Sequence, residues 1–202
     1  MRTSRHRIAV AAGAAILLLA GCTPDEPTAP EFPTDGTLTV ADLPDGDWAG
    51  PYENWIEAPG VNRILRCQAL GSLWAPGLSP VKEGTALFKD GDTLVWSMAY
   101  QLKSESAAEQ LMDQVRLAQN CVPATPDPDY EFTIEDDGST IVAWDRNSAD
   151  DRDMVIEVAA RQDGSSVVGV MVSYPTADPP DVTAEGLLDR AVEVSADLQP
   201  VE

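Results

Sequence analysis

The residues of this chain that could perform catalysis do not form a familiar catalytic motif. Its one histidine is His6, so a Ser-His-Asp triad or a Cys-His pair in the main part of the chain would lack its base. Ser79 and Lys82 have the S-x-x-K spacing of penicillin-binding enzymes, but the accompanying S-D-N and K-T-G motifs are missing. The glycine-rich patterns of nucleotide-binding loops are missing too. We therefore expect no enzymatic activity, no catalytic residue and no cofactor.

Acidic residues are densest in the stretch 145–153, whose carboxylates are the kind of ligand that Ca²⁺ prefers. Read as an EF-hand loop beginning at Asp145, the stretch has Asp150 at the sixth position, where glycine is required. Its twelfth position is Ile156, where a glutamate is required. Because the pattern fails, we expect a solvated turn between two strands and no metal site.

The length and charge of the chain limit the possible classes of protein. Its 202 residues suit one domain, and 13 Lys+Arg against 34 Asp+Glu give a net charge of −21. Such an excess of acid argues against a nucleic-acid partner, because phosphates are bound by positive charge. Hydrophobic residues make up 44% and charged residues 23%, near the averages of folded proteins, so we expect a folded domain.

The first 22 residues have the organisation of an export signal. Residues 1–7 contain three arginines and no acid, and residues 8–20 are all apolar or glycine. This run is shorter than the roughly 20 residues that cross a bilayer, but it suits a signal peptide. It ends in Leu19-Ala20-Gly21-Cys22, which resembles the lipobox of bacterial lipoproteins.

The lipobox resemblance implies that Cys22 receives a diacylglyceryl group and becomes the new N-terminus. Acyl chains such as palmitate would then anchor the protein at the outer face of the cytoplasmic membrane, since two chains give stable binding. The alternative is an ordinary cleaved signal in which Cys22 has no role. Cleavage removes His6 and three arginines but no acid, so the 13 basic residues fall to 10 and the net charge becomes −24.

We divide the chain into a signal peptide (1–21), a lipidated cysteine with a proline-rich tether (22–36) and an extracellular domain (37–202). Four prolines at intervals of three mark the tether: Pro24, Pro27, Pro30 and Pro33. Polyproline II has three residues per turn, so these prolines predict an extended stalk. The alternative is a PxxP ligand for another domain.

Two cysteines remain once Cys22 is lipidated, and an exported protein meets an oxidising environment. An even pair there usually forms a disulfide, so we predict a bond between Cys67 and Cys121. The alternative is a redox-active pair, which the absence of C-x-x-C spacing and of a neighbouring histidine argues against.

The domain is predicted to be α+β, a single antiparallel sheet with helices packed on one face. Alternating apolar residues and short turns predict six strands, at 85–88, 93–102, 130–134, 140–145, 154–160 and 166–174. Asp90-Gly91, at the centre of residues 89–92, predicts a hairpin turn between the first two strands. In the second strand the larger side chains, from Leu94 to Leu102, share one face. We expect helices at 61–70, at 104–121 with a capping box formed by Ser106 and Glu109, and after Thr183.

Four aromatic residues fall in the least regular part of the domain: Trp48, Tyr52, Trp55 and Trp74. Aromatic side chains on irregular segments can line a ligand cleft, and these four are the candidate ligand-binding residues. The alternative is that they close the open end of a small core. Trp96, Tyr100 and Trp144 stand at strand positions and are expected in the core.

Several segments together resemble the PknH-like extracellular sensor domain family: residues 38–44, 95–102, 104–117, 120–121 and 183–198. That family occurs on bacterial receptor kinases and on lipoproteins. The resemblance implies an antiparallel sheet with helices, a surface cleft and the sensing of an extracellular ligand. The family often has two disulfides, whereas this chain can form one.

We therefore expect a membrane-anchored, non-catalytic sensor or ligand-binding module with an unknown small ligand. The alternative is a structural protein of the cell envelope that docks another protein without a small ligand. A deep apolar pocket would favour the sensor, and an exposed apolar patch on the sheet would favour the docking protein.

Overall fold

The computed structural model describes residues 34–52, 67, 69–73, 76–121, 130–147, 154–196 and 198. Several predictions lie outside these residues: the signal peptide, Cys22, most of the tether, most of the helix expected at 61–70, and residues 148–153. In the described part of the chain, no helix is both long enough and apolar enough to cross a membrane.

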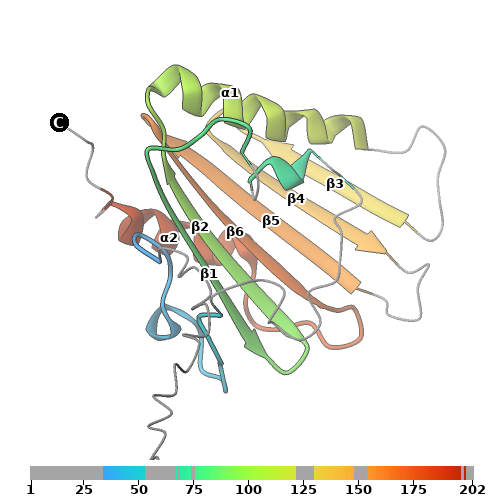
Figure 1. The fold of residues 1–202 in the computed structure, drawn as a ribbon. Coiled ribbons are helices and arrows are strands. Elements are labelled where there is room, and N and C mark those ends of the chain that lie inside the picture. Colours follow the sequence, from blue (N-terminus) through green and yellow to red (C-terminus); the bar gives the residue numbers. More distant parts are fainter. Residues whose placement is uncertain are drawn as a thin grey trace, which may run out of the picture.

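A single six-stranded antiparallel sheet forms the centre of the molecule, in the order β1-β2-β6-β5-β4-β3 (Figure 1). The strands are β1 (Lys82–Asp90), β2 (Thr93–Gln101), β3 (Tyr130–Asp136), β4 (Thr140–Asn147), β5 (Met154–Asp163) and β6 (Ser166–Pro175). After β2 the chain crosses to the far edge of the sheet and returns strand by strand, so that β6 comes to lie between β2 and β5. The predicted α+β class with one antiparallel sheet is confirmed.

The predicted hairpin between the first two strands is also confirmed. Gly91 has φ +55°, and Gly164 has the same value in the turn between β5 and β6. Two-residue turns of this kind need positive φ, which glycine adopts without steric cost.

The two α-helices have capped N-termini. Thr183 Oγ1 accepts a hydrogen bond from Gly186 N at 3.0 Å and begins α2 (Ala184–Ser195), as expected. Helix α1 (Glu105–Arg116) begins instead at Ser104, whose hydroxyl accepts from Ala107 N at 3.2 Å. The predicted capping box at Ser106 is wrong, because the extended residue that precedes the helix is Ser104 and Ser106 already lies in the first turn.

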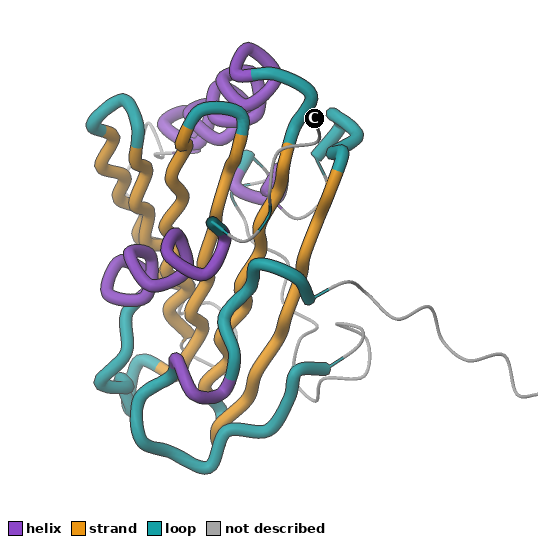
Figure 2. The backbone as a smooth tube through the Cα atoms, turned by 90° about the vertical axis from the view of Figure 1, so that its left-hand side faces the viewer, coloured by secondary structure: helices purple, strands orange, loops and turns teal. Residues whose placement is uncertain are grey.

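The helices lie on opposite faces of the sheet, which corrects the expectation that they share one face. In Figure 1, α1 and the short 3₁₀ helix η2 (Leu70–Leu73) lie in front of the sheet and α2 lies behind it; Figure 2 shows α2 from the side. The physical reason is that β6 is buried on both faces, since every residue from Val167 to Ser173 is buried and the valines of the strand divide between the two cores. A strand that is apolar on both faces needs cover on both.

Two hydrophobic clusters fill the space between the sheet and its helices. On the α1 face, buried side chains of α1 and η2 pack on even-numbered residues of β2 and β5. On the α2 face, Leu187, Leu188 and Ala191 pack on the valines of β6. A 3₁₀ helix, η3 (Leu117–Cys121), continues α1 and ends at the predicted disulfide between Cys67 and Cys121, which is confirmed.

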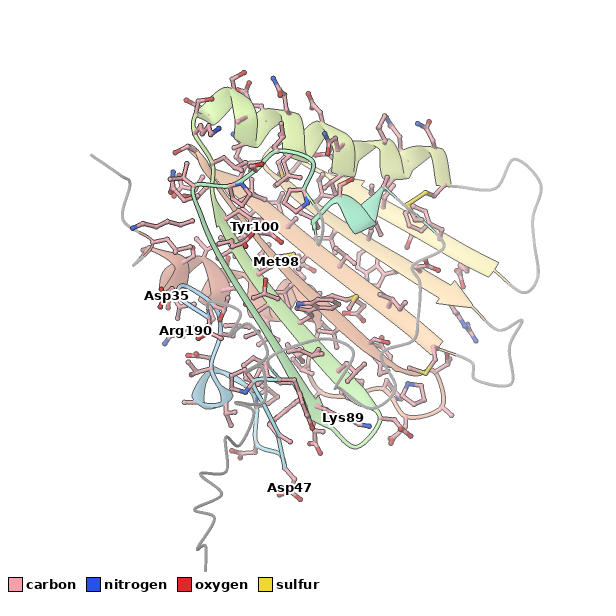
Figure 3. All side chains as sticks on the ribbon, viewed as in Figure 1. Asp35, Asp47, Lys89, Met98, Tyr100 and Arg190 are labelled. Carbon is pink, nitrogen blue, oxygen red and sulfur yellow. A yellow bond between two sulfur atoms is a disulfide. The ribbon has the colours of Figure 1, made fainter. Side chains whose placement is uncertain are left out.

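Residues 34–43 form a segment that we call the N-terminal strap, because it fastens α2 to the β1–β2 side of the sheet. Leu38 is 1% exposed, and its backbone N–H donates to Ser97 Oγ at 3.1 Å. The strap includes a 3₁₀ helix, η1 (Val40–Asp42), and Arg190 Nε of α2 donates to Asp42 Oδ1 at 2.7 Å. Figure 3 places Asp35 and Arg190 at the same side of the molecule.

Candidate functional site

The large side chains of β2 and of Leu102, which follows it, share one face, as the sequence predicted, and the structure shows that this is the α1 face. Met98, Tyr100 and Leu102 belong to the cluster beneath α1, whereas Leu94 packs with Leu87 in a smaller cluster. In Figure 3, Tyr100 lies at the end of β2 nearest α1 and Lys89 lies at the opposite end of the hairpin. The α1 face therefore has two ends. One is covered by α1, and the other lies near the β1–β2 hairpin, where Leu87 and Leu94 form the smaller cluster.

One line of paired residues crosses all six strands at this second end. It consists of Lys89, Leu94, Ser173, Ile156, Asp145 and Phe132, and we call it the Ser173 row. Directly paired residues in an antiparallel sheet point to the same face with Cβ atoms about 5 Å apart. The row therefore places a hydroxyl and a carboxylate among apolar side chains on the α1 face, with the ammonium group of Lys89 at its β1 end.

Ser173 is the more unusual of these two polar residues. It is 3% exposed, and its hydroxyl has no hydrogen-bond partner among the residues that the structure describes. Its direct neighbours in the row are Leu94 and Ile156, neither of which offers a polar side-chain atom. Burying a hydroxyl without a partner costs on the order of 1–3 kcal/mol, so such a group needs an explanation.

Asp145 lies two strands from Ser173, on the same face and in the same row. Strand spacing places the two residues about 10 Å apart. Asp145 is 2% exposed because β4 extends to Asn147, so the beginning of the acidic stretch is strand and its first carboxylate is not solvated. Within the described ranges, no three His, Cys, Asp or Glu residues come together as a metal site.

Two of the four aromatic residues predicted to bind a ligand, Trp48 and Tyr52, lie on opposite faces of the sheet. Trp48 packs on the α2-face cluster, and its indole nitrogen donates to Pro44 O at 2.9 Å. Tyr52 packs with Leu87, Leu94 and Trp96 on the α1 face. The other two predicted residues, Trp55 and Trp74, lie outside the described residues.

Backbone pairing explains why these two aromatics diverge. Ala49 pairs with Lys89 through two backbone hydrogen bonds of 2.8 and 2.9 Å, and Tyr52 N donates to Leu87 O at 2.9 Å. The segment 49–52 thus runs along the outer edge of β1. Trp48 comes just before the segment that pairs with β1 and packs on the α2 face of the sheet. Tyr52 comes at the end of that segment and packs on the α1 face.

The aromatic residues that the sequence placed in the core are buried to different degrees. Tyr100 is 3% exposed, and burial, with the carboxylate of Glu83 nearby, raises the pKa of its phenol above the ordinary value. Trp96 and Trp144 are only partly buried and face opposite sides of the sheet. Trp96 packs against both the main cluster and the small cluster of Leu87 and Leu94, so it connects the two ends of the α1 face.

The α2 face holds a buried carboxylate of its own, with a structural role. Glu157 is 5% exposed, and it accepts hydrogen bonds from Tyr174 Oη at 2.6 Å and from Ala184 N at 3.1 Å. Ala184 is the first residue of α2, where the unpaired N–H groups of a helix favour negative charge. Both carboxylate oxygens are thus used in holding α2 on the sheet.

The arrangement on the α1 face suits binding better than catalysis. A ligand site is typically an apolar surface with a few polar groups that fix orientation. The Ser173 row supplies that combination, together with the partly exposed rings of Tyr52 and Trp96. A nucleophilic serine would need a base within hydrogen-bond reach, and the residues paired with Ser173 are Leu94 and Ile156.

Sequence reasoning missed Ser173 and the burial of Asp145. The signal for Ser173 was a hydroxyl inside the apolar run of β6, at a position that alternation assigns to the same face as Met171. The pairing of Ser173 with Leu94 could not be predicted from the sequence, because α1, η3, β3, β4 and β5 all lie between β2 and β6 in the described chain.

The likeness of this chain to known proteins is distant. No protein-family model matches the chain, and no curated protein matches it. Among solved structures, the chain is similar to the extracellular domain of PknH from Mycobacterium tuberculosis, with a TM-score of 0.43 and 11% sequence identity. The similarity covers 60% of this chain and 70% of that one. The role of each residue here is therefore argued from its own surroundings.

Proposed function

We propose that this protein is an exported, lipid-anchored and non-catalytic ligand-binding or sensor domain, held at the outer face of the cytoplasmic membrane through Cys22. The observation that carries the binding role is Ser173, a buried hydroxyl without a described partner in an apolar row of the α1 face. A bound molecule would supply the missing hydrogen bond and would cover apolar surface at the same time.

The proposed location rests on two independent features. The arginine-rich start, the apolar run and Leu19-Ala20-Gly21-Cys22 occur in the order of a lipoprotein signal. The Cys67–Cys121 disulfide is of the kind that persists in oxidising compartments and is rare in the cytosol. Export accounts for both features.

A second candidate function is an envelope protein that docks another protein without a small ligand. It is favoured by β3, which stands at the end of the sheet and pairs with no described strand on its outer side. Such an edge can accept a strand from another chain. Against it, β3 carries Glu131, Glu135 and Asp136, and charged residues discourage edge-to-edge pairing.

Native mass spectrometry of the full protein, extracted with mild detergent from its own host, tests the binding role. We expect an additional mass of a small molecule that is released on denaturation. A protein that retains no small molecule but co-purifies with a stoichiometric protein partner would favour the docking function instead.

Membrane fractionation tests the anchor. Wild-type protein should sediment with membranes and incorporate labelled palmitate, whereas Cys22→Ser should lose both properties. Equal membrane association of Cys22→Ser and the wild type would contradict lipid anchoring.

A further inference from the structure

We propose, on the basis of the binding role proposed above, that the α1 face takes an uncharged amphiphile. Its apolar body would pack on Leu94, Met171 and Trp96. Its single hydroxyl or carbonyl group would hydrogen-bond to Ser173 Oγ. The observations that carry this inference are a contrast between two buried serines, the apolar surroundings of one of them, the partly exposed margin of those surroundings, and the charge of the chain.

The first observation contrasts Ser173 with Ser97, which lies on the neighbouring strand and points to the opposite face. Ser97 is 0% exposed and Ser173 is 3% exposed, so solvent reaches neither. Ser97 Oγ accepts a 3.1 Å hydrogen bond from Leu38 N, whereas Ser173 Oγ has no partner in the described part of the chain. Among the residues that the structure describes, one buried hydroxyl is thus satisfied, and a matching one is left that another molecule could satisfy.

The second observation is the chemistry around Ser173. On the same face, its strand neighbours are Met171 and Pro175, and its direct partners across the sheet are Leu94 and Ile156. Trp96 is the diagonal neighbour of Ser173 on β2, and residues in this relation lie about 7–8 Å apart. All of these side chains can contact an alkyl or aromatic body. The side chains of Met171, Pro175, Leu94 and Ile156 offer no hydrogen-bond donor, so beside Ser173 the indole N–H of Trp96 is the other polar group of this set.

The third observation is that the apolar surface has a partly exposed margin. Leu87 and Leu94 are 2% and 5% exposed, while Tyr52 and Trp96, which pack against them, are partly exposed. Aromatic rings at such a margin can contact a ligand that enters from solvent. The body of the ligand would therefore approach over Trp96, with its polar group directed toward Ser173.

The charge of the protein argues for an uncharged ligand over an anion. The chain has 34 acidic residues against 13 basic ones. In the Ser173 row, Asp145 is buried at 2% exposure, whereas the cation Lys89 is partly exposed on the outer strand β1, where solvent screens its charge. A carboxylate or phosphate headgroup would approach against this field. A neutral hydroxyl or carbonyl group is not repelled and still completes the hydrogen bond.

Displacement of the uncharged fluorescent probe N-phenyl-1-naphthylamine tests the inference on the full chain. The competitors are 1-decanol, decane and decanoate, which share a similar apolar body and differ in the polar group. We expect 1-decanol to displace the probe most strongly. Ser173→Ala should weaken 1-decanol about 3- to 10-fold, the effect of one neutral hydrogen bond, and should leave decane unchanged.

Two further variants separate binding from folding. Ser173→Thr keeps the hydroxyl and should keep 1-decanol affinity within about threefold of the wild type. Ser97→Ala removes an equally buried serine from the other face and should leave 1-decanol affinity unchanged, although it weakens the fold. Retention of folding in each variant is checked by circular dichroism before titration.

Three outcomes would overturn the inference: no displacement by 1-decanol, equal losses with Ser173→Ala and Ser97→Ala, or tightest binding of decanoate. The proposed function fails separately. If the host-purified protein carries an ionic or fully polar ligand, the binding role stands and the uncharged amphiphile is wrong. If it carries no small molecule and 1-decanol does not bind, both are wrong.

Discussion

Tyr174 Oη donates a 2.6 Å hydrogen bond to Glu157 Oε1, and the other oxygen of the same carboxylate accepts from Ala184 N. Tyr174 belongs to β6, Glu157 to β5 and Ala184 to α2, so one buried carboxylate joins two strands to the start of a helix. This helix also contacts the N-terminal strap through Arg190. The position of α2 thus depends on a small number of polar contacts in addition to apolar packing.

Glu157→Gln should lower the free energy of unfolding by about 1–3 kcal/mol, because it removes the negative charge that the buried helix N-terminus and the phenol both contact. Tyr174→Phe, which removes only one hydrogen bond, should cost about 1 kcal/mol. Urea denaturation measures both. Glu193→Gln, an exposed acid on α2 paired with Arg190, is the matched control and should change stability by less than about 1 kcal/mol. Equal losses in Glu157→Gln and Glu193→Gln would contradict the role of Glu157.

Alkaline pH should destabilise the protein through its buried tyrosines. Burial raises the pKa of Tyr174, and the hydrogen bond to Glu157 raises it further. Burial and Glu83 likewise raise the pKa of Tyr100, both relative to the ordinary value of 10.0. Because the folded state favours the protonated phenol, this stability is complete below pH 10 and is lost as the pH rises above it.

Urea denaturation at a series of pH values from 8 to 11 measures this alkaline loss. Tyr174→Phe and Tyr100→Phe should each flatten the decrease above about pH 10. An unchanged slope in the double variant would show that other groups cause the alkaline loss.

The two buried serines should respond oppositely to removal of the hydroxyl. Ser97→Ala leaves the buried N–H of Leu38 without its acceptor and should cost about 1–3 kcal/mol. Ser173→Ala removes a hydroxyl that has no described partner, so in ligand-free protein it should be neutral or stabilise by up to about 1 kcal/mol. Thermal melts of delipidated, ligand-free samples compare the two. A loss in Ser173→Ala as large as that in Ser97→Ala would mean that the Ser173 hydroxyl is already satisfied.

Acid should weaken the attachment of the N-terminal strap. Burial acts to raise the pKa of Asp42, but hydrogen bonds from Thr39 N and Oγ1, both 2.8 Å, and the Arg190 guanidinium outweigh it and lower the pKa below 3.8. The resulting stability is present above pH 3.8 and is lost as the pH falls through the lower, folded-state pKa. Asp42→Asn should be less stable than the wild type at pH 6, and the difference should shrink toward pH 2.

The matched control for Asp42→Asn is Asp178→Asn, which removes an exposed carboxylate and should shift stability by no more than about 0.5 kcal/mol at pH 6. Denaturant titrations at pH 6 and pH 2 make the comparison. If the difference between Asp42→Asn and the wild type stays constant over this range, the carboxylate does not hold the strap through its charge.

Removing the disulfide should cause the largest loss of stability among these variants. The bond closes a loop with a sequence separation of 54, which in the chain-entropy model stabilises the folded state by about 4 kcal/mol. The double variant Cys67→Ala, Cys121→Ala should therefore unfold at much lower urea concentration. Alkylation of the wild type should label both thiols only after reduction, and equal labelling without reductant would contradict the pairing in the exported protein.

The sequence was sufficient wherever a structural signal is local. Alternation of side chains predicted all six strands, Asp90-Gly91 predicted the first hairpin, and Thr183 predicted the start of α2. The cysteine pair was predicted because only two cysteines were left to pair. At α1 a local signal was misread, because two serines stand close together and only the backbone conformation distinguishes the cap, Ser104, from Ser106.

Which helix covers which face of the sheet, and which residues align across the strands, depend on tertiary contacts. The run of valines in β6 is apolar on both sides, so alternation cannot say which helix covers which face, and the helices proved to lie on opposite ones. The alignment of Ser173 with Leu94, Ile156 and Asp145 depends on the register of strands far apart in the chain. A register shift of one residue would move every side chain of a strand to the opposite face. The place where the buried hydroxyl of Ser173 meets an apolar surface is therefore determined by long-range strand pairing, which cannot be read from the sequence.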